Sequence, residues 1–125
     1  HCRFIHGYSL EFEFVFGTNE LDENNWVVDF GGLNDLEAWL RLNFDHKTLV
    51  AFDDPLLSFF EEMHENEAID MVSVQATGCE MFAKMAMEYS SDLIQKLYGN
   101  RCWVESVTVR EHGSNSAVCS RTDIE

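Results

Sequence analysis

Three places in the sequence hold side chains that could take part in chemistry. Cys2 stands four residues before His6, Asp45 is followed directly by His46, and Glu111 ends an alternating run near the end of the chain. Thiols, imidazoles and carboxylates can all transfer protons or bind metal ions. The sequence therefore offers groups suited to acid–base chemistry or metal binding at three separated positions.

Each of these residues also has a simpler explanation. A lone cysteine such as Cys2 is more often a small buried hydrophobe than a reactive group. Asp45 could end a helical region, with His46 on the surface. Glu111 shares the parity of Trp103, Val107 and Val109, so it lies either at the wet end of a sheet or buried against a partner, since an unpaired buried carboxylate is costly.

The elements that position these groups follow from hydrophobic periodicity. Near the N-terminus apolar residues alternate with polar ones, and the apolar set is Tyr8, Leu10, Phe12, Phe14 and Phe16. A period of two predicts a half-buried strand. His6 has the same parity, so a strand extending back through Gly7 would point the imidazole toward the apolar side, with Cys2 just upstream.

The middle of the chain changes from strand to helix spacing. Residues 26–30 form a short apolar run that predicts the return strand of a hairpin. Residues 32–44 have helical spacing, with Asn34 and Glu37 placed as a capping box. Residues 53–65 predict a second short helix, begun by Pro55 at its first turn.

The last third contains a strand, the longest helical pattern and a hairpin. We assign them to residues 69–76, 77–100 and 102–121, with Gly99 as the helix stop. Hairpin strands with helices between them predict an α+β fold, in which helices pack on one face of an antiparallel sheet.

Composition limits the protein class. A chain of 125 residues with 46% hydrophobic residues suits one domain, and we assign residues 1–125 to it. A net charge of −15 without a basic stripe argues against nucleic acid as a partner. Four cysteines without a CxxC pair, no leader and no membrane-length apolar run predict a cytoplasmic protein with reduced thiols. The first residue is not methionine, so we expect the N-terminus to be incomplete.

Five motifs in order carry a resemblance to a family. They are C-x-x-x-H-G-Y-S, VVDFGGL, FDHKTL, T-G-C-E and V-x-V-R-E, and together they resemble the 6-pyruvoyltetrahydropterin synthase and 6-carboxytetrahydropterin synthase family. The resemblance implies a T-fold, in which a four-stranded antiparallel sheet carries two main helices on one face. It places the first strand before this chain. It also implies a homo-oligomer, a trimer or hexamer.

The resemblance assigns roles to the reactive residues. Cys2 matches the catalytic cysteine, and Asp45 and His46 match the partner acid–base group. His6 matches the first histidine of the His-Gly-His zinc pair, which implies a Zn²⁺ cofactor. Tyr8 stands where the family has its second zinc histidine, and the third ligand falls in a strand upstream of the cysteine.

The resemblance also implies a pterin pocket. Glu111 would accept hydrogen bonds from the 2-amino group and ring N3–H of a pterin, a forked pattern that suits a carboxylate. Thr77 and Glu80 would be further substrate ligands, although their T-x-x-E spacing equally predicts a capping box.

The implied function is that of a lyase resembling 6-carboxytetrahydropterin synthase. It would convert 7,8-dihydroneopterin triphosphate on the route to 7-deazaguanine compounds such as the queuosine precursor. The alternatives are 6-pyruvoyltetrahydropterin synthase and a non-catalytic T-fold protein that binds pterin. The expected partner is a small pterin substrate, without nucleic acid or membrane.

Overall fold

A three-stranded antiparallel sheet forms the centre of the molecule. The computed structural model describes residues 4–7 and 9–124. The strand order is β1-β4-β5, made of β1 (Glu11–Thr18), β4 (Cys102–His112) and β5 (Asn115–Ser120). The predicted α+β class and the terminal hairpin are confirmed. Within the described residues this sheet has three strands, against four in the complete fold that was expected.

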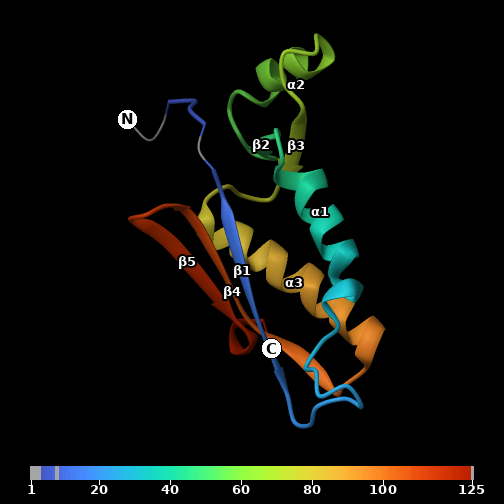
Figure 1. The fold of residues 1–125 in the computed structure, drawn as a ribbon. Helices are drawn as coiled ribbons and strands as arrows, with labels where there is room; N and C mark the ends of the chain where they lie inside the picture. The colour runs from blue at the N-terminus through green and yellow to red at the C-terminus, as the bar shows by residue number, and fades with distance from the viewer. Residues whose placement is uncertain (1–3, 8, 125) are drawn as a thin grey trace.

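Two helices cover one face of the sheet (Figure 1). Helix α3 (Cys79–Tyr98) packs on β4 and β5, and α1 (Asn34–Phe44) lies beside it. The Trp39 ring of α1 stacks on Tyr89 of α3 with centroids 4.5 Å apart, and Phe44 meets Phe12 of β1 at 4.7 Å. The arrangement of two main helices on one face is therefore confirmed.

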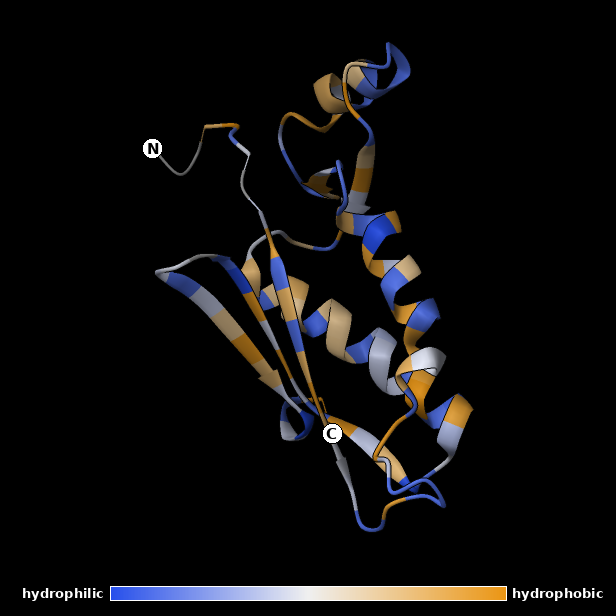
Figure 2. Ribbon diagram, in the orientation of Figure 1, coloured by the Kyte–Doolittle hydropathy of each residue, from blue (hydrophilic) through white to orange (hydrophobic). Residues whose placement is uncertain are grey.

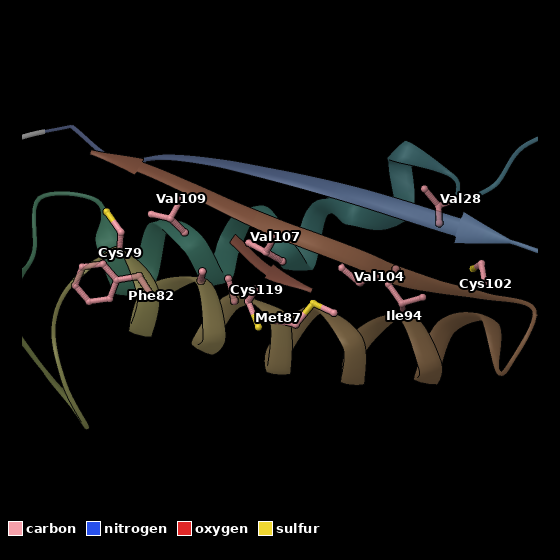
Figure 3. Packing of buried hydrophobic residues seen from close by; sticks show 12 residues of the cluster. Val28, Cys79, Phe82, Met87, Ile94, Cys102, Val104, Val107, Val109 and Cys119 are labelled. Carbon is pink, nitrogen blue, oxygen red and sulfur yellow. The ribbon is translucent and has the colours of Figure 1, made fainter. Parts of the chain in front are cut away.

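The core lies between α3 and the inner face of the sheet (Figure 3). Met87 and Ile94 of α3 pack against Val104, Val107 and Val109 of β4, and all five are at most 1% exposed. Hydrophobic and hydrophilic stretches alternate along the ribbon of α3 (Figure 2). Among the described residues, none of the helices combines the length and apolar character that a bilayer crossing requires.

Strand β1 shows the predicted alternation over a shorter range. Phe12 and Phe14 are half-buried, whereas Glu11 and Glu13 are exposed. The strand begins at Glu11 and does not extend back to His6, so the condition under which the imidazole would face the apolar side is not met. The imidazole is exposed instead of facing the core.

A bulge changes the parity of β4. The register against β1 shifts at one point and leaves Glu105 as the extra residue. Trp103 therefore lies beside Gly17 on the face opposite to the buried Val104. A Cβ at Gly17 would stand 2.6 Å from the Trp103 indole nitrogen, which only glycine permits. The prediction that Trp103 shares the apolar face with the later valines of β4 is wrong.

A second, smaller sheet was not predicted. Strands β2 (Thr48–Ala51) and β3 (Met71–Val74) pair in parallel and are connected through α2 (Leu57–Glu65). This unit lies beyond the end of α1, at the top of Figure 1. The strand expected within residues 69–76 is confirmed as β3, and α2 begins two residues after Pro55.

The prediction of a strand over residues 26–30 is wrong. The Asp22 carboxylate accepts hydrogen bonds from two backbone N–H groups that follow it, and Asp29 accepts one from Gly31. Asp29 thereby caps the short 3-10 helix η1 (Phe30–Leu33). Local side-chain caps thus replace strand pairing in this segment.

Both predicted capping boxes are also wrong. Because η1 runs directly into α1, Asn34 is already the first helical residue and cannot act as its cap. Helix α3 begins at Cys79 with Gly78 as N-cap, at φ 114° and without a side-chain cap hydrogen bond. Thr77 and Glu80 therefore do not cap α3.

Candidate active site

One large cavity brings together most of the residues that the sequence singled out. Its volume is about 1020 Å³, and it opens between the N-terminal segment, the end of α1 and β2. His6, Asp45, His46 and Thr77 all line it. Its apolar lining includes Phe12, Phe44 and Phe82. The cavity therefore places titratable groups beside a hydrophobic surface that could hold a flat ring.

Asp45 and His46 form a hydrogen-bonded pair at the end of α1. The Asp45 backbone N–H donates to the Arg41 carbonyl and closes the helix. The His46 Nδ1 atom lies 2.7 Å from Asp45 Oδ1, and the His46 side chain is 94% exposed. His46 has φ 56°, in the left-handed region that few non-glycine residues adopt. This backbone turn leaves an exposed imidazole, hydrogen-bonded to a carboxylate, among the residues that line the cavity.

His6 lies on the opposite, N-terminal side of the cavity. Its Nδ1 atom is 2.7 Å from the Phe4 carbonyl oxygen. A carbonyl can only accept, so this contact places the proton on Nδ1 of the neutral ring. Cys2 and Tyr8, the other residues of the N-terminal motif, lie outside the described residues.

Glu111 is not part of the cavity lining. It stands near the end of β4, where its Oε2 atom is 3.9 Å from the Cys79 thiol and its Oε1 atom accepts from Asn115 Nδ2 at 2.6 Å. Thr77 lines the cavity two residues before Cys79, and two residues span at most about 7 Å. The Glu111 carboxylate thus lies beside the first residue of α3, two residues after Thr77 of the cavity lining.

Glu80, like Glu111, is a predicted ligand that does not line the cavity. It is exposed on the first turn of α3. A Cβ at Gly78 would lie 3.5 Å from Glu80 Oε2, so the carboxylate folds back toward the start of its own helix.

The described cysteines carry protons at neutral pH. Burial raises the pKa of the Cys79 thiol above its usual value of 9.0, and the charges of Glu111 and Glu80 raise it further. Burial likewise raises the pKa values of Cys102 and Cys119. Cys79 next to Glu111 is therefore a neutral donor and a poor nucleophile.

The described residues do not fit a zinc centre. Zinc needs several nitrogen or sulfur donors in tetrahedral order. Among residues 4–7 and 9–124, no three His, Cys, Asp or Glu side chains are grouped so that they could hold a metal ion. His6 is the residue in this range to which the motif resemblance assigns a ligand role, and one histidine does not make a zinc site.

Sequence reasoning missed two cations and two neighbours of Glu111. Arg41 and Lys47 line the cavity, where they pair with Glu37 and Asp70. The Lys47 ammonium lowers the pKa of the Asp70 carboxyl. Both cations flank Asp45 and His46 in the sequence, which was the available signal. Cys79 and Asn115 gave no signal, because their contacts with Glu111 depend on the packing of α3 and β5 on β4.

The fold and the cavity define an α+β protein of the T-fold class, and comparison with known proteins identifies its family. The family model for 6-pyruvoyl tetrahydropterin synthase matches residues 1–122. The chain therefore belongs to the 6-pyruvoyl tetrahydropterin synthase family.

Several relatives have the name 6-carboxy-5,6,7,8-tetrahydropterin synthase. The protein from Rickettsia bellii is 26% identical over 98 residues, which cover 78% of this chain and 68% of that protein. The protein from Helicobacter pylori strain J99 is 29% identical over 126 residues, covering 97% and 62%. The protein from Rickettsia typhi is 35% identical over 54 residues, covering 42% and 39%. The chain thus spans less than two thirds of the length of the Helicobacter and Rickettsia typhi relatives.

A solved structure shares the fold. The crystal structure of an uncharacterized protein from Wolinella succinogenes superimposes with a TM-score of 0.81 at 21% identity. The match covers 96% of this chain and 81% of that one.

Proposed function

We propose that this chain is a lyase of the 6-carboxy-5,6,7,8-tetrahydropterin synthase type that acts on 7,8-dihydroneopterin triphosphate. The observation that carries the proposal is the Asp45–His46 pair on the cavity wall, 2.7 Å between Oδ1 and Nδ1. A carboxylate that orients an imidazole is an arrangement suited to proton transfer. The names of the relatives support a pterin synthase, and the lyase class is part of the proposal.

In this proposal each residue has one task. The pterin ring lies against the apolar lining, and Glu111 receives its 2-amino and N3–H groups. Thr77 and Glu80 are further contacts on the same side. His46 exchanges protons with the substrate side chain, and Cys2 is the second proton-transfer group. Arg41 and Lys47 line the cavity and would exchange their partners Glu37 and Asp70 for the triphosphate.

Product analysis tests the reaction. Incubation with 7,8-dihydroneopterin triphosphate should release acetaldehyde and triphosphate and leave 6-carboxytetrahydropterin. Triphosphate without acetaldehyde, with all side-chain carbons retained, would instead identify 6-pyruvoyltetrahydropterin synthase. The 7-deazaguanine route and a cytoplasmic location are further parts of this proposal.

A non-catalytic pterin-binding protein is the second candidate, favoured by Tyr8 at the position of the family's second zinc histidine. Metal analysis of the wild type and of His6→Ala separates the two. Near-stoichiometric zinc that is lost with His6→Ala supports the enzyme. Pterin binding without zinc and without turnover supports the binding protein.

We also propose that the protein is a homo-oligomer, a trimer or hexamer. Strands β1 and β5 are the outer strands of the described sheet, and Val15 and Val118 are 43% and 61% exposed on them. Unpaired strand edges in native proteins are usually covered. Light scattering on the protein as it elutes from a size-exclusion column measures the number of subunits. A monomer would contradict the proposal.

A further inference from the structure

The Glu111 carboxylate is held on both oxygens by residues from two other elements. Cys79, the first residue of α3, lies with its Sγ 3.9 Å from Oε2. Asn115, the first residue of β5, donates from Nδ2 to Oε1 at 2.6 Å. The side chain is therefore fixed between the start of a helix and the next strand of its own sheet.

The chemistry of each neighbour suits this task. Cys79 is 7% exposed, and its thiol keeps its proton at neutral pH. It can therefore donate a weak hydrogen bond to the Glu111 carboxylate while remaining neutral. The Asn115 amide donates and cannot ionise. Neither of these two neighbours carries a positive charge, so both hold Glu111 by hydrogen bonds and not by ion pairing.

We propose that Cys79 and Asn115 are positioning residues that set the orientation of Glu111, and thereby the selectivity of the pocket for a ring edge with two adjacent N–H donors. This inference rests on the proposed function, because Glu111 is the pterin ligand there. A carboxylate whose plane is fixed can accept hydrogen bonds from two adjacent N–H groups of a ring at the same time. A carboxylate that rotates accepts them one at a time.

Two ligands measure that selectivity. Pterin has the 2-amino group beside N3–H, and lumazine is the same ring system with an oxygen at C2 in place of the amino group. The dissociation constants of both should be determined by fluorescence titration for the full chain and its variants. Cys79→Ala should weaken pterin binding about three- to tenfold, the size expected for one modest hydrogen bond, with little change for lumazine.

Matched variants separate positioning from packing. Cys79→Ser keeps a donor and should restore pterin affinity close to that of the wild type. Asn115→Ala, on an exposed residue, should lower the preference for pterin in the same direction as Cys79→Ala. Cys119→Ala is the control, because Cys119 is also 7% exposed with a sulfur contact of 3.9 Å, to the Ser120 carbonyl. It should leave both affinities unchanged.

The outcomes are distinct. Equal pterin affinity in wild type, Cys79→Ala and Asn115→Ala would overturn this inference alone. An equal loss for pterin and lumazine, or a Cys79→Ser variant as weak as Cys79→Ala, would also overturn it, because the residue would then act through packing. A wild type that binds no pterin would overturn the proposed function and this inference with it.

Discussion

His46 Nδ1 lies 2.7 Å from Asp45 Oδ1, across two consecutive residues at the end of α1. Neighbouring side chains on a helix or strand point in different directions. The pair meets because Asp45 leaves the helix in an extended conformation and His46 adopts a left-handed one. The contact is therefore a product of the backbone turn as much as of the two residue types.

We expect His46→Ala to lower kcat by about 10²–10⁴-fold, because it removes a proton-transfer group. Asp45→Asn should cause a smaller loss, since the imidazole remains and only its orienting charge is removed. Steady-state rates with 7,8-dihydroneopterin triphosphate measure both effects. A His46→Ala variant with the rate of the wild type would show that His46 does not take part in proton transfer.

The left-handed backbone at His46 predicts that a glycine variant is more stable than an alanine variant, the reverse of the usual order. At φ 56° glycine is unstrained, whereas alanine keeps the steric cost of its Cβ. His46→Gly should therefore be more stable than His46→Ala by about 0.5–1 kcal/mol, even after the larger chain entropy of unfolded glycine. Urea denaturation measures the difference.

An exposed position inside a helix provides the control for this pair. At Lys84 in α3 the order should reverse, with the alanine variant about 1 kcal/mol more stable than the glycine variant. The same order at both positions would mean that the backbone at His46 is not constrained to the left-handed region.

Periodicity predicted the elements that carry the core. The alternating phenylalanines of β1, the apolar stripe of α3 and the terminal hairpin were all predicted, since their patterns span at least two turns or several alternations. The four-residue strand β2 was not predicted, because its parallel partner β3 lies about twenty residues later and four residues hold little pattern. The bulge at Glu105 was missed because an inserted residue leaves no compositional mark.

The candidate site was predicted in its residue types and not in its arrangement. Family motifs indicated Asp45, His46 and Glu111, and the structure adds that the first two share a cavity with His6. The contact of Glu111 with Cys79, 32 residues away in the sequence, depends on how α3 packs on β4. Motif order predicts which residues matter, whereas tertiary packing decides which of them touch.

Cys2→Ala should abolish turnover while fold and pterin affinity stay nearly unchanged, because a thiol that moves protons contributes little to packing. The rate of the wild type should rise with pH together with the alkylation rate of this thiol. Turnover of Cys2→Ala at the parent rate would make the catalytic assignment wrong.

The buried thiols should make the free energy of unfolding depend on pH in the alkaline range. Burial raises the pKa of Cys119 above 9.0, so the folded chain keeps a proton that the unfolded chain has lost. Stability is therefore complete below the pKa of the unfolded thiol and falls as the pH rises through the folded value. The stability of Cys119→Val relative to wild type should increase from about pH 8 to pH 10. A constant difference across this range would show that Cys119 titrates normally in the folded state.

Glu111→Gln should weaken pterin binding far more than it changes folding. The amide keeps one acceptor and replaces the other with a donor that faces the N–H groups of the pterin, so a charge-assisted pair becomes a clash of donors. The loss should be about 2–4 kcal/mol, which corresponds to roughly 30- to 1,000-fold in affinity. The melting temperature should hold or rise slightly, because a half-buried charge is removed. Titration with pterin beside thermal melts distinguishes the cases: equal affinities would make Glu111 a solvated strand end, and a large drop in melting temperature would show that its contacts with Cys79 and Asn115 serve the fold.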